Sequence, residues 1–205
     1  MRVIITGTDT DVGKTVLSAA LSAKLHAHYW KPVQSGLDAP TDSQTIATLA
    51  GPHVTILPEA YRLAAPLSPN IAARRDGVLI EREKLLLPAV EGPLVVEGAG
   101  GVLVPYSDTL LAADLFAIWS LPVILVARTS LGTINHTLLS IEALRARKVP
   151  LLGVFFMGPE NRETEACIVA HGATRHLGRL PRLDPLTPDS LAEAFAATTL
   201  AGMAQ

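Results

Sequence analysis

The sequence predicts an α/β fold in which a twisted, mostly parallel sheet is flanked by helices on both faces. Short apolar runs rich in Val, Ile and Leu alternate with helical segments along the whole chain. No internal repeat, low-complexity tract or linker interrupts this alternation, and 205 residues suit one sizeable domain. We therefore expect a single domain over residues 1–205.

The order of elements follows from the apolar runs and the segments between them. Strands are expected at 2–6, 28–33, 93–97, 122–127, 151–157 and 177–180. Helices are expected at 14–27, 42–50, 81–90, 110–119, 133–146, 161–172 and 188–199. The stretch 110–127 is as apolar as a membrane span, but Pro122 would break a helix there, so we interpret it as a helix followed by a strand.

A phosphate-binding loop follows the first strand. The run Gly7-Thr8-Asp9-Thr10-Asp11-Val12-Gly13-Lys14-Thr15 resembles the pattern G-x-x-x-x-G-K-[ST], in which backbone N–H groups converge on one anion. Lys14 adds positive charge for terminal phosphates, and the Thr15 hydroxyl is a hard oxygen ligand for Mg²⁺. The N-terminus of the following helix also favours negative charge. Together with the α/β alternation, this loop predicts a fold like that of the P-loop NTPases.

Composition limits the partners and the compartment. Hydrophobic residues make up 49% of the chain and aromatics 4%, so the core must be built mainly from aliphatic side chains. The net charge of −2 argues against bulk electrostatic binding to nucleic acid or to an anionic membrane. A single cysteine, Cys167, excludes an intrachain disulfide, and the chain enters a strand without a signal-like segment. We expect a cytoplasmic protein.

Functional residues are expected after each strand, because parallel sheets bind ligands at the carboxyl ends of their strands. Lys31 ends the second strand and would bring a second positive charge, and Ser35 offers a hydroxyl. Asp42 begins the next helix, where it or Thr41 could be an ordinary cap; alternatively, the Asp42 carboxylate could bind Mg²⁺. Glu97 ends the third strand, a common place for a second metal carboxylate, and glycines follow it.

The fourth strand leads into Arg128 to His136, another helix N-terminus. Ser130 or Thr133 could cap this helix, and its exposed N–H groups could hold a carboxylate; the sequence leaves an ordinary cap equally open. The sequence has no H-E-x-x-H pattern and no G-x-S-x-G pattern, so neither a zinc hydrolase nor a serine hydrolase is indicated.

Four runs taken together resemble the dethiobiotin synthetase family: Gly7 to Thr15, Lys31 to Gly36, Glu97 to Gly101 and Leu131 to His136. Their order and intervals match as well. The resemblance implies closure of a cyclic urea from 7,8-diaminononanoate, CO₂ and ATP in biotin synthesis. One amine becomes a carbamate, ATP phosphorylates it, and the second amine expels phosphate. Carbamate and triphosphate are both anions, so bringing them together needs positive charge more than a protein nucleophile.

The resemblance also implies roles for individual residues. Lys31, Lys14 and Thr10 would be the catalytic residues. Mg²⁺ would be held by Thr15, Asp42 and Glu97. The nucleotide would be bound by Asp11, Val12, Gly13, Lys14, Thr15, Val16, Asp42, Glu97, Gly98, Ala99, Gly100, Met157, Gly158, Pro181, Arg182 and Leu183. The diamine substrate would contact Ser35 and, across the interface of a homodimer, the helix start formed by Gly132, Thr133, Ile134 and Asn135.

This sequence departs from the family pattern at two places. Many members have an Asn after the fifth strand that reads the adenine base, whereas this chain has Met157, which cannot form paired hydrogen bonds. We therefore expect weak discrimination between ATP and other nucleoside triphosphates. Where a His often follows Ser-Pro in the family, this chain has Asn70.

Two other classes resemble parts of this pattern. Dimerising switch ATPases of the partitioning and septum-placing type usually carry an additional lysine next to the first glycine of the loop, and Thr8 stands there in this chain. Glutamine-dependent amidotransferase synthetases need a nucleophilic cysteine in a further domain, for which 205 residues leave no room.

Overall fold

The computed structural model describes residues 1–204 and contains nine strands. They are β1 (Arg2–Gly7), β2 (His28–Trp30), β3 (Val33–Ser35), β4 (Thr55–Ile56), β5 (Tyr61–Leu63), β6 (Leu94–Gly101), β7 (Val123–Arg128), β8 (Leu151–Met157) and β9 (His176–Leu180). Seven of them form one sheet in the order β4-β2-β6-β1-β7-β8-β9, and β3 and β5 form a second, small sheet. Every pairing between these strands is parallel, which confirms the predicted fold class.

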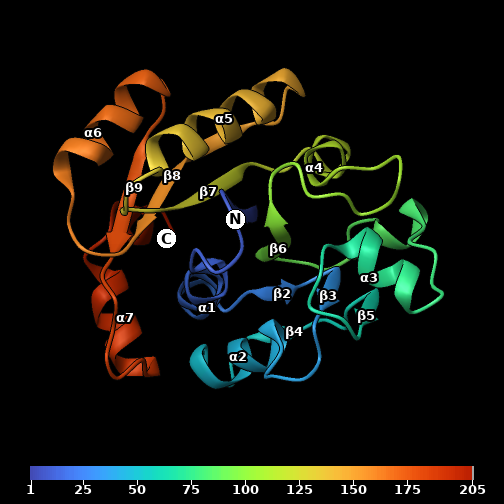
Figure 1. Ribbon diagram of the computed structural model, residues 1–205. Helices are drawn as coiled ribbons and strands as arrows, with labels where there is room; N and C mark the ends of the chain where they lie inside the picture. The colour runs from blue at the N-terminus through green and yellow to red at the C-terminus, as the bar shows by residue number, and fades with distance from the viewer. Residues whose placement is uncertain (205) are drawn as a thin grey trace.

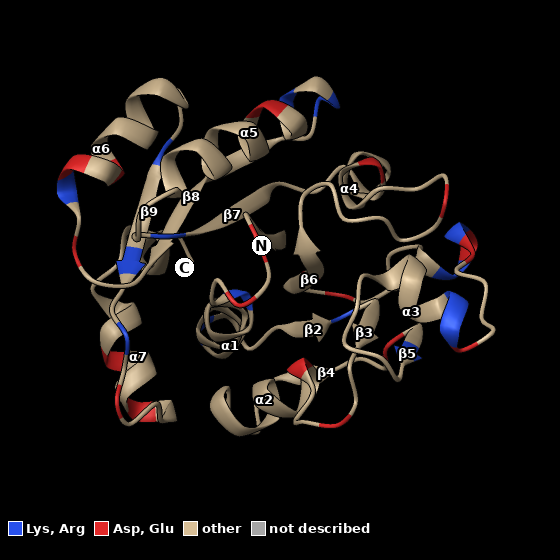
Figure 2. Ribbon diagram, viewed as in Figure 1, with Lys and Arg blue, Asp and Glu red and all other residues tan. Residues whose placement is uncertain are grey.

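Helices cover both faces of the large sheet (Figure 1). They are α1 (Lys14–Leu25), α2 (Asp42–Leu49), α3 (Pro69–Arg75), α4 (Ala112–Trp119), α5 (Thr133–Ala146), α6 (Arg162–His171), α7 (Pro188–Ala196) and α8 (Thr199–Met203), with a 3₁₀ turn, η1 (Arg82–Leu85). No helix within residues 1–204 is long and apolar enough to cross a membrane. Lys and Arg are interspersed with Asp and Glu over the ribbon (Figure 2).

The strands separate two hydrophobic cores, because successive side chains point to opposite faces of a sheet. In β1, Ile4 packs into the core beneath α4, α5 and α6, whereas Val3 and Ile5 pack beneath α1, α2, α7 and α8. In β8, Phe156 and Phe155 divide in the same way. The central strands are buried on both faces, as their continuous apolar sequences require.

Two predicted elements were wrong. The strand expected at 28–33 is two strands in different sheets, because Pro32 has no N–H to continue a ladder. The helix expected at 81–90 is only the short turn η1, which ends at Leu85; Leu86, two residues before Pro88, is already in extended conformation. A proline disfavours the helical conformation in the residue before it and cannot donate the next helical hydrogen bond.

Several boundaries also differ. The helix expected at 14–27 ends at Leu25, since His26 adopts a left-handed conformation with φ of 48°. The helix expected at 188–199 is interrupted, and Thr198 caps α8 by accepting a hydrogen bond from the Ala201 N–H. The sequence analysis missed β4, β5, α3 and α8, which have two to seven residues each. Elements of this length carry too few residues to establish a period.

The third predicted strand, 93–97, continues to Gly101 as β6. Its register against β1 is regular up to the pair of Ile5 with Glu97 and then shifts, so that Gly7 pairs with Gly101. Glu97 is therefore the last residue before an irregularity in the central ladder. Its carboxylate lies 2.9 Å from Thr15 Oγ1, where the phosphate loop passes into α1.

Candidate active site

The phosphate loop joins β1 to α1 at the centre of the sheet. Gly13 precedes α1 with φ of 95°, a conformation that glycine adopts without strain. A Cβ on Gly7 would lie 2.9 Å from the Asp9 carbonyl oxygen, so the turn needs glycine there as well. Five residues separate Gly7 from Gly13, one more than the pattern G-x-x-x-x-G-K-[ST] allows. Thr8 therefore occupies the position of the first glycine, and Asp9, not Thr8, stands where switch ATPases carry the additional lysine.

Lys14 is buried at the floor of this loop. Its Nζ donates a hydrogen bond to the Asp9 carbonyl at 2.8 Å. Burial lowers the pKa of Lys14, and the nearby charge of Lys31 lowers it further, against the opposing effect of Glu97 and Asp42. An anion beside Lys14 would counter both effects, so this position favours a phosphate group.

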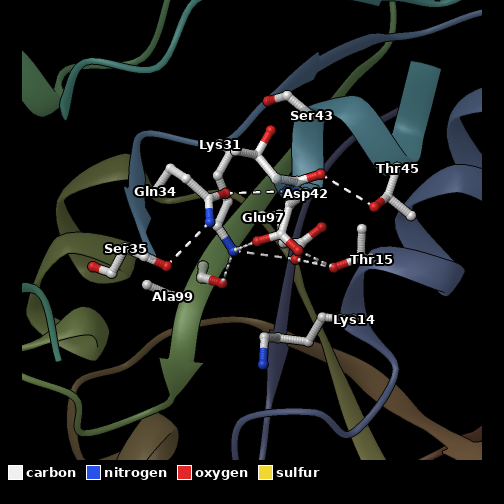
Figure 3. Close-up of polar contacts among 12 residues, drawn as sticks. Lys14, Thr15, Lys31, Gln34, Ser35, Asp42, Ser43, Thr45, Glu97 and Ala99 are labelled. Atoms are coloured by element: carbon white, nitrogen blue, oxygen red, sulfur yellow. Dashed lines mark hydrogen bonds and ion pairs between the residues drawn. The ribbon is translucent and has the colours of Figure 1, made fainter. Parts of the chain in front are cut away.

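Lys31, Asp42, Glu97 and Thr15 form one polar cluster, defined here as the carboxylate cluster (Figure 3). The Lys31 Nζ lies 2.7 Å from Asp42 Oδ2 and 3.2 Å from Glu97 Oε1. The Thr15 Oγ1 lies 2.6 Å from Asp42 Oδ1 and 2.9 Å from Glu97 Oε1. These four side chains come from β2–β3, α2, β6 and α1, so the fold brings together four positions that are distant in sequence.

The opposite charges within the carboxylate cluster raise the pKa of Lys31 and lower the pKa of Asp42. Burial alone would lower the pKa of Lys31, but the charges of Glu97 and Asp42 outweigh it and raise that pKa above its ordinary value. Burial opposes ionisation of Asp42, yet the charge and hydrogen bond of Lys31, together with the hydrogen bond from Thr15, lower its pKa. The carboxylate cluster therefore favours the charged form of Lys31.

The donor set of the cluster fits Mg²⁺. Thr15, Asp42 and Glu97 offer hard oxygen atoms, and Mg²⁺ is usually held by one or two protein carboxylates with phosphates and water completing its shell. Over residues 1–204, no group of three or more His, Cys, Asp or Glu side chains is arranged to hold a metal. The hydroxyl of Thr15 and the carboxylates of Asp42 and Glu97 suit a Mg²⁺–nucleotide complex.

The two interpretations of the Thr41–Asp42 segment prove compatible. Thr41 is the cap of α2, since its side chain accepts a hydrogen bond from the Gln44 N–H in a capping box. Asp42 is thereby left for the carboxylate cluster. The buried Gln34, which the sequence analysis did not single out, accepts a hydrogen bond from the Asp42 N–H through Oε1 at 3.2 Å.

One cavity of about 970 Å³ unites most of the predicted site residues. Those that line it are Thr10, Asp11, Gly13, Lys14, Thr15, Val16, Lys31, Ser35, Asp42, Glu97, Ala99 and Gly100. Val12 is buried in the core instead, and Gly98 contributes its carbonyl, which accepts a hydrogen bond from Lys31 Nζ. The cavity also has an apolar wall that the sequence analysis missed, which includes Val33, Pro66, Leu67 and Val104.

Ser35 lies on this cavity at the end of β3. Among the residues that the structure describes, its buried hydroxyl oxygen has no hydrogen-bond partner. A buried polar atom without a partner carries a desolvation cost that a ligand can relieve. The predicted substrate contact at Ser35 therefore has a physical basis.

A second group of predicted residues lies outside the cavity, at the ends of β8 and β9. Met157 reaches the phosphate loop, because a Cβ on Gly13 would lie 2.6 Å from its Cε. The Gly158 N–H donates to the Leu180 carbonyl, and Arg179 donates to the Gly158 carbonyl at 3.1 Å. Pro181, Arg182 and Leu183 follow directly. The ends of β8 and β9 therefore lie side by side, and the Met157 thioether contacts the phosphate loop at Gly13.

The third group, Gly132, Thr133, Ile134 and Asn135, also lies outside the cavity of its own chain. The predicted cap by Ser130 or Thr133 was wrong: Gly132 is the cap residue, with φ of 92°, and within residues 1–204 no side chain caps α5. Leu131 beside it is fully exposed. This helix start thus presents backbone N–H groups and an apolar side chain at the surface.

Comparison with known proteins assigns the family. A family model described as an AAA domain matches residues 1–190. ATP-dependent dethiobiotin synthetase BioD from Agrobacterium fabrum is 62% identical over 197 residues, covering 96% of this chain and 93% of that protein. The protein of that name from Rhodopseudomonas palustris (strain BisB5) is 60% identical, covering 95% and 92%. The chain belongs to the dethiobiotin synthetase family. The family predicted from the sequence is confirmed.

Solved structures share the fold at low identity. A ParA family ATPase from Chlorobium tepidum has a TM-score of 0.61 at 11% identity, covering 99% of this chain and 95% of that chain. The cell division ATPase MinD from Pyrococcus furiosus has a TM-score of 0.62 at 13% identity, covering 98% and 97%. These similarities establish the P-loop ATPase fold of the dethiobiotin synthetase family member described here, and no more than the fold.

Proposed function

We propose that this chain closes the ureido ring of dethiobiotin from 7,8-diaminononanoate and CO₂ with consumption of ATP, as a step of biotin synthesis. Membership of the dethiobiotin synthetase family supports this function. The observation that carries it is the cavity in which the phosphate loop, two buried lysines and two carboxylates meet an apolar wall. A nucleotide triphosphate and an alkyl diamine can both be accommodated there.

The reaction proceeds in three steps. One amine of the substrate attacks CO₂ and loses a proton, which gives a carbamate. A carbamate oxygen attacks the γ-phosphorus of ATP, which gives a carbamic-phosphoric anhydride and ADP. The second amine attacks the carbamoyl carbon and expels phosphate, which closes the ring. Two anions must approach each other in the second step, so cations positioned at the site lower its barrier.

The residues of the cavity meet this need. Lys14 and the loop N–H groups would bind the terminal phosphates, and Lys31 would neutralise the carbamate as a permanent cation. Thr10 lines the cavity near Gly100 and would contact the carbamate and the phosphates. Thr15, Asp42 and Glu97 would hold Mg²⁺, which would neutralise phosphate charge when bound. Each group acts by position and charge, so no protein nucleophile is required.

The rest of the substrate would lie along the apolar wall, with Ser35 as a polar contact. The carboxylate of the substrate would reach the N-terminus of α5, where uncapped N–H groups suit an anion. Because Gly132 to Asn135 lie outside the cavity of their own chain, a second copy would have to supply them. We therefore propose a homodimer with shared sites, and the exposed Leu131 would lie at the interface.

At the end of the nucleotide away from the phosphates, the base would lie against Met157, Gly158 and Pro181 to Leu183. A thioether offers dispersion contacts but no hydrogen-bond pattern specific to adenine. Weak selectivity among nucleoside triphosphates is thus part of the proposal. Nucleic acid and membrane are not proposed as partners, and a cytoplasmic location stays a prediction.

Turnover of the diamine tests the function. The purified chain is incubated with 7,8-diaminononanoate, bicarbonate, ATP and Mg²⁺, and dethiobiotin and ADP are quantified. We expect equal amounts of both products. Hydrolysis of ATP that does not depend on the diamine, with no dethiobiotin formed, would instead indicate a nucleotide switch.

Sedimentation velocity of wild type and Leu131→Glu tests the dimer: a monomeric wild type would contradict the shared site.

A further inference from the structure

We propose that Tyr29 is a positioning residue for Glu97: its hydroxyl holds one carboxylate oxygen so that the other faces the metal and Lys31. This inference rests on the proposed function, because it assumes that Glu97 is part of a Mg²⁺–nucleotide site. Tyr29 lies in β2, outside the cavity, and would contact neither substrate nor metal.

The two oxygens of Glu97 have different partners. Oε2 accepts a hydrogen bond from the Tyr29 hydroxyl at 3.0 Å. Oε1 lies 2.9 Å from Thr15 Oγ1 and 3.2 Å from Lys31 Nζ. The carboxylate is therefore divided between a structural side and a functional side. A carboxylate held at one oxygen cannot rotate about its terminal torsion without losing that hydrogen bond.

The sheet register brings this contact about. Tyr29 pairs with Val95 in the ladder between β2 and β6, and Glu97 is two residues further along β6, on the same face. Both Tyr29 and Glu97 are completely buried. The Tyr29 ring packs in the core beneath α1 with Val3, Ile5 and Val95, so the position of the hydroxyl is fixed by packing rather than by a flexible side chain.

The hydroxyl can act only as a donor to Glu97. Burial raises the pKa of Tyr29 well above its ordinary value, and the negative charges of Glu97 and Asp42 raise it further. A phenylalanine at this position would keep the ring and leave Glu97 Oε2 buried without its partner.

Loss of such an orienting contact has a known scale. Substitutions of residues that orient metal ligands typically reduce metal affinity or activity by about 10–100-fold. Since the effect acts through Glu97, it should appear only when the metal is present. A merely structural role of Tyr29 would instead weaken nucleotide binding with and without metal alike.

The experiment compares Tyr29→Phe with Tyr61→Phe. Tyr61 is a matched control, because its buried hydroxyl accepts a hydrogen bond from a backbone N–H, that of Glu81, and does not contact the carboxylate cluster. ADP affinity is measured by calorimetry with Mg²⁺ and with EDTA, at a temperature below the melting point of each variant. We expect Tyr29→Phe to weaken binding by about 10-fold with Mg²⁺ and to leave binding in EDTA unchanged. Tyr61→Phe should match wild type in both.

Equal losses in both buffers, or no loss in either, would overturn the proposal. A Glu97→Gln background gives a second measurement: there, adding Tyr29→Phe should change Mg²⁺-dependent binding by less than about 2-fold, because the carboxylate that Tyr29 is proposed to orient has been removed. A full additional loss in that background would also overturn it. A wild-type chain that forms dethiobiotin, beside an unaffected Tyr29→Phe, would refute the inference alone; a wild type without turnover would refute the proposed function.

Discussion

Replacement of Lys31 by methionine should separate the electrostatic role of this residue from its structural one. The side chain is 5% exposed, and its Nζ lies 2.7 Å from Asp42 and 3.2 Å from Glu97, whose side chains are 29% and 0% exposed. Methionine keeps most of the volume but removes the charge. Breaking a buried ion pair from one side typically costs about 3–5 kcal/mol, because the remaining charge stays buried and unpaired. Since Asp42 is partly exposed, we expect the lower end of this range, a loss of about 3 kcal/mol in the free energy of unfolding.

In Lys31→Met, we expect kcat to fall and the stabilisation by Mg²⁺ to increase. Removing one preorganised donor to a developing anion usually lowers kcat by about 10²–10³-fold, so we expect a loss of at least about 100-fold. Mg²⁺ alone should stabilise this variant more than wild type, because the two carboxylates have lost their cation. Urea unfolding with and without Mg²⁺ measures the second effect, with the exposed Lys24→Met as control. A kcat within about threefold of wild type, or no added stabilisation by Mg²⁺, would refute the reasoning.

The remaining predictions concern the base and the response to acid. Wild type should prefer ATP over GTP, CTP and UTP by less than about 100-fold in kcat/KM, which corresponds to about 3 kcal/mol, and Met157→Asn should raise that preference. A preference of wild type above that limit would contradict the proposal that Met157 lies against the base and gives weak selectivity. The pKa of Asp42 lies below its ordinary value of 3.8, so its contribution to stability is present above that value and is lost as pH falls through the lower folded pKa. Asp42→Asn should therefore lose less stability than wild type between about pH 5 and pH 3 in urea unfolding, and parallel curves would argue against an ionised Asp42–Lys31 pair.

The parts of the fold that the sequence predicted are those with a strong local signal. The helix at 133–146 and the strand at 151–157 were predicted with the observed boundaries, because each is a long run with a consistent apolar pattern. The break at Pro32 and the short turn at 82–85 were missed, although prolines marked both places. There the count of apolar residues outweighed the missing N–H of a proline, which was the stronger constraint.

The candidate site divides in a similar way. Lys31, Asp42 and Glu97 were identified because each follows or begins an element at the carboxyl edge of the sheet. Tyr29 and Gln34 were not, since their importance depends on the partners Glu97 and Asp42, which lie 68 and 8 residues away. Within an apolar strand, Tyr29 is indistinguishable from a core aromatic. Only the register between β2 and β6 places its hydroxyl on the carboxylate.

The division of the strands between two sheets has a consequence for how this enzyme family can change its substrate. Ser35 belongs to β3, which pairs with β5 and shares no ladder with the strands that carry the phosphate loop and Glu97. In the proposed function, one wall of the cavity would bind phosphate and the other would hold the organic acceptor. The chain passes directly from the large sheet to the small one at Lys31 and Pro32. Loops around the small sheet could be exchanged while the ladders of the large sheet stay intact, provided that the hydrogen bond from the Asp42 N–H to Gln34 in β3 is kept. If the diamine lies along the apolar wall as proposed, redesign for other diamines would begin at Val33, Pro66 and Leu67, which line the cavity apart from the carboxylate cluster.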